Sequence, residues 1–300
     1  LLLLLLLLLL PISSLLPPPP SPSWTVPSIT PSQLLLHPPP SLRPRAIVHF
    51  LPGAFLSASP ITYYRFLEPL ASLGLIIVTP RYPLLLDRLQ TCDAILSEFS
   101  TLAPTLIESY GALPVVGVGH SQGAVLQTLI TSLFREAPRA GNVLISWNDR
   151  PLAETVPAYG AVEAAIKAVP REVGDAQVRA ANDAVRGVMG GVNVRDILAQ
   201  VGAENSYDDV AGLLGQVPEV LRVVRDGGGE TYPSREEGEL AMLRGYRARR
   251  TLVCSYDSDG IDESDYVFDV VRRASEVQGF KRGVGGTVSR WRGAGGHAEP

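Results

Sequence analysis

The chain has 300 residues, of which 46% are hydrophobic and 19% are charged, and its formal net charge is −4 at pH 7. This composition supplies enough apolar material for a sizeable core and excludes an intrinsically disordered acidic or basic protein. The slight negative charge argues against nucleic acid as the main partner, because phosphate binding favours a basic surface. Two cysteines, Cys92 and Cys254, are too few for a disulfide scaffold or a cysteine-rich zinc module, so we expect two buried free thiols.

The first 42 residues differ in composition from the rest of the chain. They contain no Asp, Glu, Lys or Arg, they begin with ten consecutive leucines, and they include proline runs at 17–20 and 38–40. We expect residues 1–42 to be a low-complexity leader, disordered in its proline-rich part. A targeting signal is the alternative, although the leucine run lacks a positive n-region and is shorter than the about 20 residues that a transmembrane helix needs. No later segment predicts a membrane span, so we expect the body to be soluble.

From Arg43 onward, short apolar runs alternate with segments of helical periodicity. The predicted strands are 46–51, 75–79, 114–119 and 142–146. The predicted helices are 61–73, 84–110 with an interruption near Pro104, and 122–135. Continuous apolar strands of this kind are typical of a parallel sheet with helices on both faces.

Strand-forming runs are missing between about Asp149 and Arg249, and helical spacing replaces them. The predicted helices of this stretch are 162–169, 176–188, 194–201, 209–225 and 235–246. Strands then return at 251–255 and 286–291, with a helix over 264–278 between them. We therefore expect one α/β domain over residues 43–300, with a helical cap inserted at about 149–249 that lies over the site and sets substrate choice.

The segment Gly119-His120-Ser121-Gln122-Gly123 matches the pattern G-x-S-x-G. The pattern alone is weak evidence, but here it lies where a predicted strand ends and a predicted helix begins. A serine on such a tight turn presents its hydroxyl above the sheet edge, and glycines on either side avoid a clash. We therefore predict that Ser121 is a nucleophile on an elbow formed with Gly119, His120 and Gly123.

A serine hydroxyl needs a base to take its proton, and the chain has four histidines. His37 lies in the leader, His49 lies within a predicted strand and is expected in the core, and His120 adjoins the serine on a turn that should direct it away. His297 follows the last predicted strand, in a glycine-rich stretch that can fold back toward Ser121. We expect His297 to be the base, and a solvated C-terminal histidine is the alternative.

The acid that orients the base is expected in the stretch 251–263, after the strand that follows the cap. Asp259 is favoured, because an Asp-Gly turn there aims the carboxylate off the sheet edge. Asp257 and Asp262 are the alternatives, although Asp262 can simply cap the next helix. The chain order Ser121, Asp259, His297 is the order that the α/β-hydrolase fold requires.

Acyl transfer also needs hydrogen-bond donors for the oxyanion. One is the backbone N–H of Gln122, and the other is expected from Gly53 or Ala54, because Pro52 has no N–H to donate. An ordinary Pro-Gly turn is the alternative for this loop.

Several stretches of the chain resemble an α/β-hydrolase-like family of unknown function from cyanobacteria and plastid-bearing eukaryotes. They are residues 49–55, 62–68, 78–83, 116–134 and 139–157, and residues 255–264 are similar to the acidic segment of that family. The resemblance implies the α/β-hydrolase fold and a plastid (chloroplast) location, but no substrate. The chain departs from the family at Pro52-Gly53, where the family has Gly-Gly, and at Asp87-Arg88, where it has Asp-His. The helix that normally follows the histidine is missing, so we expect a truncated C-terminus.

These features together predict a serine hydrolase of the esterase, lipase or thioesterase type. The substrate is expected to be a small-molecule acyl ester or thioester, lipid-like in view of the large and fairly apolar cap. No metal and no organic cofactor are expected, because serine, base and oxyanion donors account for acyl transfer. The alternative is a non-catalytic α/β-hydrolase relative that binds a lipid or a protein partner, since a fold does not by itself define a function.

Overall fold

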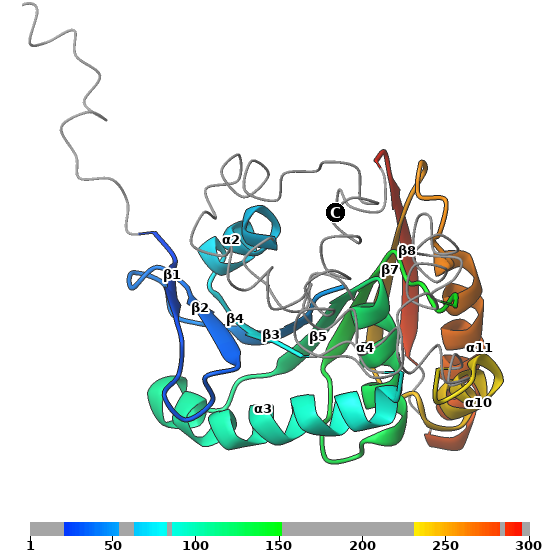
Figure 1. The fold of residues 1–300 in the computed structure, drawn as a ribbon, viewed down its shortest axis with the longest axis horizontal. Helices are drawn as coiled ribbons and strands as arrows, with labels where there is room; N and C mark the ends of the chain where they lie inside the picture. The colour runs from blue at the N-terminus through cyan, green and yellow to red at the C-terminus, as the bar shows by residue number, and fades with distance from the viewer. Residues whose placement is uncertain (1–20, 54–62, 83–85, 152–230, 283–285, 296–300) are drawn as a thin grey trace, which may run out of the picture.

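The computed structural model describes residues 21–53, 63–82, 86–151, 231–282 and 286–295. The described strands form one twisted eight-stranded sheet (Figure 1). In sheet order they are β1 (Ser23–Thr25), β2 (Gln33–His37), β4 (Leu75–Pro80), β3 (Ala46–Leu51), β5 (Val115–His120), β6 (Gly141–Ile145), β7 (Arg250–Tyr256) and β8 (Thr287–Gly293). The strands from β3 onward are mutually parallel, which confirms the mostly parallel sheet expected from their continuous apolar runs.

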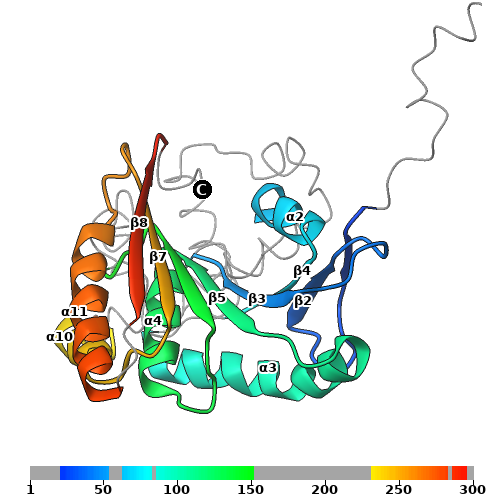
Figure 2. The ribbon, with the colours of Figure 1, turned by 180° about the vertical axis from the view of Figure 1, so that it is seen from behind.

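The expectation of a disordered leader is wrong for the described residues 21–42. β2 pairs antiparallel with β4, with Leu36 opposite Ile77, and β1 pairs with β2 at the edge of the sheet (Figure 2). The side chains of Leu34, Leu35 and Leu36 are all buried. The absence of charged residues in β2 therefore reflects burial of this strand within the sheet rather than low complexity.

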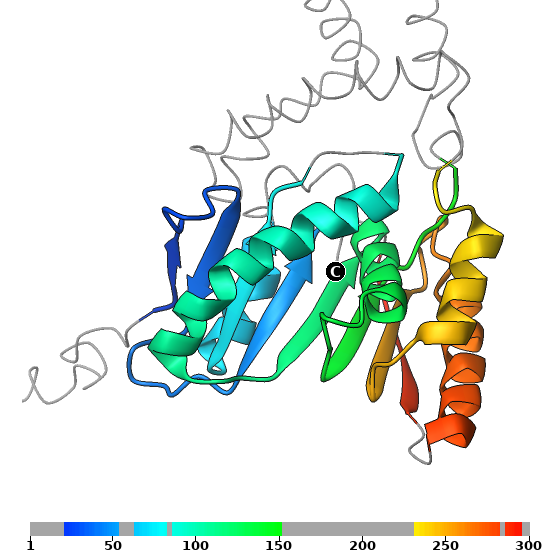
Figure 3. The same cartoon turned by 90° about the horizontal axis from the view of Figure 1, so that it is seen from below.

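Helices cover both faces of the sheet (Figure 3). α2 (Tyr64–Ser72) packs on one face against β3 and β4, and α3 (Arg88–Tyr110) and α4 (Gln122–Leu133) cover the opposite face. The interruption predicted near Pro104 does not occur, and α3 runs through it. Pro104 and Ser100 are exposed. Pro104 has no N–H to donate to the carbonyl group of Ser100, and both residues lie on the exposed side of the helix.

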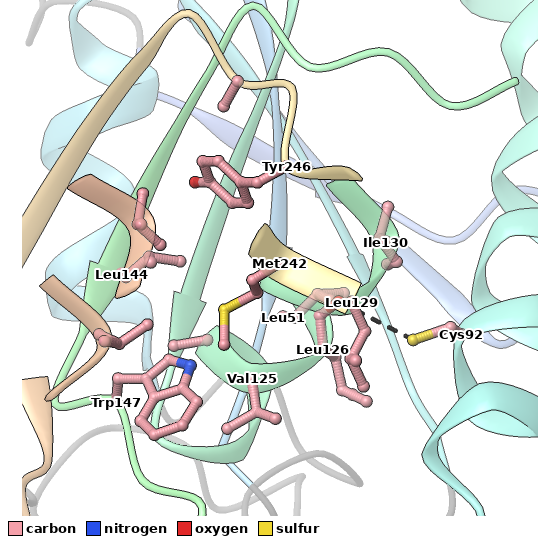
Figure 4. Close-up of a cluster of buried hydrophobic side chains, with 14 of the residues drawn as sticks. Leu51, Cys92, Val125, Leu126, Leu129, Ile130, Leu144, Trp147, Met242 and Tyr246 are labelled. Atoms are coloured by element: carbon pink, nitrogen blue, oxygen red, sulfur yellow. Dashed lines mark hydrogen bonds between the residues drawn. The ribbon is translucent and has the colours of Figure 1, made fainter. Parts of the chain in front are cut away.

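α10 (Arg235–Gly245) was expected in the cap but belongs to the helix layer of the domain. It packs between α4 and α11 (Ser264–Arg282), and Met242 and Tyr246 at its C-terminal end are buried in the same core cluster (Figure 4). A Cβ atom on Gly245 would lie 2.1 Å from the carbonyl oxygen of Ser132, so the backbones of α10 and α4 are in close contact at this point. The cap therefore does not extend to about 249, as the sequence had predicted, because α10 belongs to the main domain. Residues 152–230 lie outside the described part.

The described residues also bear on the cysteines and on membrane-spanning helices. Cys92 and Cys254 are free and buried, as expected. Within the described ranges, every helix is too short or too polar to cross a membrane.

The burial of β2 leads to a stability prediction. Leu36→Ala should lower the free energy of unfolding by about 2–5 kcal/mol, because it removes a fully buried side chain and leaves a cavity. Ile29→Ala is the matched control, since Ile29 is 56% exposed, and it should change stability by less than about 0.5 kcal/mol. Urea denaturation measures both values. Equal, small effects of the two substitutions would contradict a packed β2.

Candidate active site

Ser121 lies on the turn between β5 and α4 in a strained backbone conformation, with φ 54° and ψ −123°. A positive φ is unfavourable for serine and persists only where the surroundings enforce it. Here the Ser121 N–H donates to the carbonyl oxygen of Ile145 on β6 at 2.9 Å, and its own carbonyl oxygen accepts from Ala124 N–H at 3.0 Å. The serine is thus held at the carboxyl edge of the sheet, at the N-terminus of a helix whose dipole favours negative charge.

The two glycines of the motif are required by close backbone contacts. A Cβ atom on Gly119 would lie 2.3 Å from the carbonyl oxygen of Gly123, and a Cβ atom on Gly123 would lie 2.0 Å from that of Leu51. Neither position has room for a side chain. The turn therefore closes tightly against the end of β3, which places the loop after β3 beside the serine.

That loop contributes Gly53, whose N–H was one of two alternatives for the second oxyanion donor. Gly53 is close to the serine, because a Cβ atom on it would lie 3.3 Å from Ser121 Cβ. Its N–H, however, already donates to the hydroxyl of Tyr63 at 3.0 Å. Ala54, the other alternative, lies outside the described residues. Gln122 begins α4, where backbone N–H groups have no acceptor within the helix.

Three of the four histidines lie in described parts of the chain, and each has a hydrogen-bond partner. His37 bonds to the hydroxyls of Thr25 and Tyr110. His49 is fully buried and accepts a bond from Arg139 at 2.9 Å, as expected of a core residue, and burial lowers the pKa of its imidazole well below the ordinary value. His120 Nδ1 lies 2.7 Å from the Tyr63 hydroxyl. His297 lies outside the described residues.

The segment that follows β7 and carries the expected acid is hydrogen-bonded to the end of β8 and the residues just after it. After β7, Asp257 N–H donates to the carbonyl oxygen of Gly293 at 3.0 Å, and Ser258 N–H donates to that of Gly295 at 2.9 Å. Gly295 is two residues before His297. The loop with the acidic residues is therefore bonded to the stretch that leads to the histidine.

The three candidate acids differ in their surroundings. Asp257 is exposed, with 62% of its side-chain surface accessible. Asp262 accepts a bond at 2.8 Å from the N–H of Ser264, the first residue of α11, so it contributes to the cap of that helix. Asp259 is half-buried, and its Oδ1 accepts from Ile261 N–H at 3.1 Å. Among the three, Asp259 combines partial burial with a turn that is separate from the helix cap.

The sequence did not reveal a second strained serine at the same edge. Ser146 follows β6 with φ 46°, and its N–H donates to the carbonyl oxygen of Cys254 at 2.9 Å. Its hydroxyl is buried and has no partner within the described residues. A serine at the end of an apolar run gives no sign in the sequence of a left-handed conformation.

Asp87 and Arg88 both have structural roles in this fold. Asp87 caps α3 by accepting from Gln90 N–H at 2.9 Å, and Arg88 forms a buried ion pair with Asp149. Burial raises the pKa of the Asp149 carboxyl, and the Arg88 charge partly offsets this effect. Asp149 N–H in turn donates to Glu263, which also pairs with Arg235 at 2.7 Å. This cluster joins the chain just before residue 152 to the chain just after residue 230.

No cluster of three or more His, Cys, Asp or Glu side chains suited to a metal ion occurs among the residues that the structure describes.

Residues 32–281 match the family described as "Protein of unknown function (DUF1350)". No curated protein matches the chain in sequence. Among solved structures, the chain is similar to a candidate lipase from Acinetobacter baumannii AYE, with TM-score 0.51 and 11% identity over 93% of this chain and 85% of that one. It is also similar to an esterase of the bacterial hormone-sensitive lipase family, with TM-score 0.50 and 14% identity over 95% and 77%. These similarities show that the fold is the α/β-hydrolase fold, as predicted.

The close contacts of the turn lead to a prediction for Gly123. Gly123→Ala should destabilise the protein by about 3 kcal/mol or more, because the new methyl group meets the backbone of β3 rather than a side chain that can move. Gly260→Ala is the control, since nothing lies within 4 Å of its Cβ position. Chemical denaturation compares the two variants, and equal stability would show that the turn does not close against β3 as described.

Proposed function

Because the chain belongs to the DUF1350 family of proteins of unknown function and has the α/β-hydrolase fold, we propose that it is a serine hydrolase that cleaves an ester or a thioester. The observation that carries the proposal is the conformation of Ser121. Its positive φ is maintained by backbone hydrogen bonds and by two glycines without room for a side chain. Strain of this kind is concentrated at functional sites, and this turn has the geometry of a nucleophile elbow.

In the proposed reaction, Ser121 Oγ attacks the carbonyl carbon of the substrate and its proton passes to His297. Asp259 orients the imidazole and stabilises its positive charge. The tetrahedral oxyanion accepts hydrogen bonds from Gln122 N–H and from Ala54 N–H. Ala54 is preferred to Gly53 as the second donor, because the N–H of Gly53 already donates to the Tyr63 hydroxyl. The intermediate collapses when the alcohol or thiol leaves with the proton from His297. Water then cleaves the acyl-Ser121 ester by the reverse sequence of proton transfers.

Two observations support the roles of Asp259 and His297. The loop that carries Asp259 is hydrogen-bonded to Gly293 and Gly295, and Gly295 is two residues before His297. Their order in the chain, after Ser121, is the order that this fold uses. His297 lies outside the described residues, so the assembled triad is part of the proposal.

The substrate class rests on the expected cap and on the similar structures. The two similar proteins are a candidate lipase and an esterase, which favours an acyl ester. The lipid-like acyl chain is carried over from the cap expected in the sequence. A plastid location stays a prediction drawn from the resemblance.

Covalent labelling tests the nucleophile. The purified protein should react with a fluorophosphonate, and Ser121→Ala should abolish the adduct while the melting temperature stays near that of the parent, because the hydroxyl contributes little packing. Intact-mass spectrometry detects the adduct. If the parent forms no adduct and hydrolyses neither short nor long acyl esters and thioesters, the protein is better described as a non-catalytic relative that binds a lipid or a protein partner.

Substitution of the acids tests the triad. Asp259→Asn should lower kcat by on the order of 10⁴-fold, because an amide no longer holds the imidazole in the tautomer that accepts the serine proton. Asp257→Asn is the matched control, since that side chain is exposed two residues earlier, and its kcat should remain near the parental value. Steady-state hydrolysis of a p-nitrophenyl ester gives both values. A larger loss in Asp257→Asn than in Asp259→Asn would reassign the acid.

A further inference from the structure

Two buried tyrosine hydroxyls hold the loop that follows β3. The hydroxyl of Tyr82 donates to the carbonyl oxygen of Pro52, and the hydroxyl of Tyr63 accepts from Gly53 N–H at 3.0 Å. Both rings are almost fully buried, with 4% and 5% of their surface exposed. The polar groups of two consecutive loop residues are thus bonded to side chains from separate parts of the chain. A loop that only needed to turn would not require two buried phenols.

The Tyr63 hydroxyl continues this interaction to the nucleophile elbow. Its oxygen also lies 2.7 Å from His120 Nδ1, and His120 directly precedes Ser121. The oxygen accepts from Gly53, so its single hydrogen is available to donate to His120 Nδ1. Burial raises the pKa of Tyr63 far above its ordinary value, so this hydrogen is retained. Two hydrogen bonds in series therefore form a hydrogen-bond chain from Gly53 N–H through the Tyr63 hydroxyl to the imidazole of His120.

This hydrogen-bond chain lies between the loop after β3 and Ser121. A Cβ atom on Gly53 would lie 3.1 Å from His120 Nδ1, 3.3 Å from Ser121 Cβ and 3.3 Å from the Tyr63 hydroxyl. All three groups therefore surround one backbone position. The spacing between the loop and the serine depends on the Tyr63 hydroxyl, because it is the atom that bonds to both sides.

We propose, on the basis of the serine-hydrolase function proposed above, that Tyr63 is a positioning residue for the transition state. Its hydroxyl ties Gly53 to His120, fixes the distance between the loop after β3 and Ser121, and takes the N–H of Gly53 out of the set of oxyanion donors. Donors aimed at an oxyanion act by their fixed placement, and a loss of placement is felt in the transition state more than in the bound substrate.

Tyr63→Phe tests this role, because it removes the hydroxyl and keeps the packed ring. We expect kcat for p-nitrophenyl acetate to fall by about 30- to 100-fold while KM changes less than about twofold, which is the pattern of an interaction that acts in the transition state. Tyr64→Phe is the matched control, because its hydroxyl interacts with Glu68, and it should retain the parental kcat.

Variants of His120 test the other end of the chain. His120→Asn can place an oxygen acceptor near the position of Nδ1, whereas His120→Leu cannot accept a hydrogen bond. We expect the asparagine variant to keep a kcat within about tenfold of the parent and the leucine variant to lose as much as Tyr63→Phe. Tyr63 and His120 belong to the same hydrogen-bond chain. The kcat of the double variant Tyr63→Phe/His120→Leu should therefore be only slightly lower than that of either single variant. If Tyr63→Phe does not fold, the pair of His120 variants carries the test.

The outcomes separate this inference from the proposed function. A parent that reacts with fluorophosphonate, together with a Tyr63→Phe variant of parental kcat, overturns the positioning role and leaves the serine-hydrolase function in place. A fall in melting temperature without a fall in kcat has the same meaning. A parent with neither labelling nor turnover overturns the proposed function and, with it, this inference.

Discussion

The close approach between the turn at Ser121 and the end of β3 is the constraint on which the candidate site depends. The contact of Gly123 with the Leu51 carbonyl oxygen leaves no room for a side chain, and it holds two neighbouring strand ends at a fixed distance. Ser121 can keep a positive φ because this contact and the bond from its N–H to Ile145 hold it in place. The strain is therefore balanced by the packing of α4 and three strands, and not by the turn alone.

Buried charged side chains lie outside this turn, and their interactions hold neighbouring parts of the fold together. Arg88 and Asp149 pair beside Glu263, at the points where the chain leaves the sheet before residue 152 and returns after residue 230. Arg139 donates a hydrogen bond to the imidazole of His49 within β3, and burial lowers the pKa of its guanidinium to about 10. A buried pair is costly to break, because the remaining group is left without its partner. These pairs fix where elements meet, while the tyrosine hydroxyls fix the loop beside the serine.

Much of the fold could be predicted from the sequence, because its parallel strands are short apolar runs bounded by turn residues. All six strands predicted after residue 43 are present, and so is the turn at Ser121. β1 and β2 were missed because a strand buried between proline-rich turns has the same charge-free composition as a low-complexity leader. α10 was assigned to the cap because helical spacing does not tell which surface a helix packs on. Tyr63 was missed because its role depends on contacts with Gly53 and with His120, 57 residues away. No local pattern encodes such contacts.

In the proposed reaction, Ser121 forms a covalent acyl intermediate whose oxyanion is held by backbone donors. A crystal structure of the fluorophosphonate-treated protein tests this most directly. The account predicts a bond from phosphorus to Ser121 Oγ, a phosphoryl oxygen about 2.7–3.1 Å from the Gln122 nitrogen, and the His297 ring within hydrogen-bonding distance of Ser121 Oγ. Phosphorus on another residue, a phosphoryl oxygen directed away from the N-terminus of α4, or an ordered His297 far from Ser121 would contradict it.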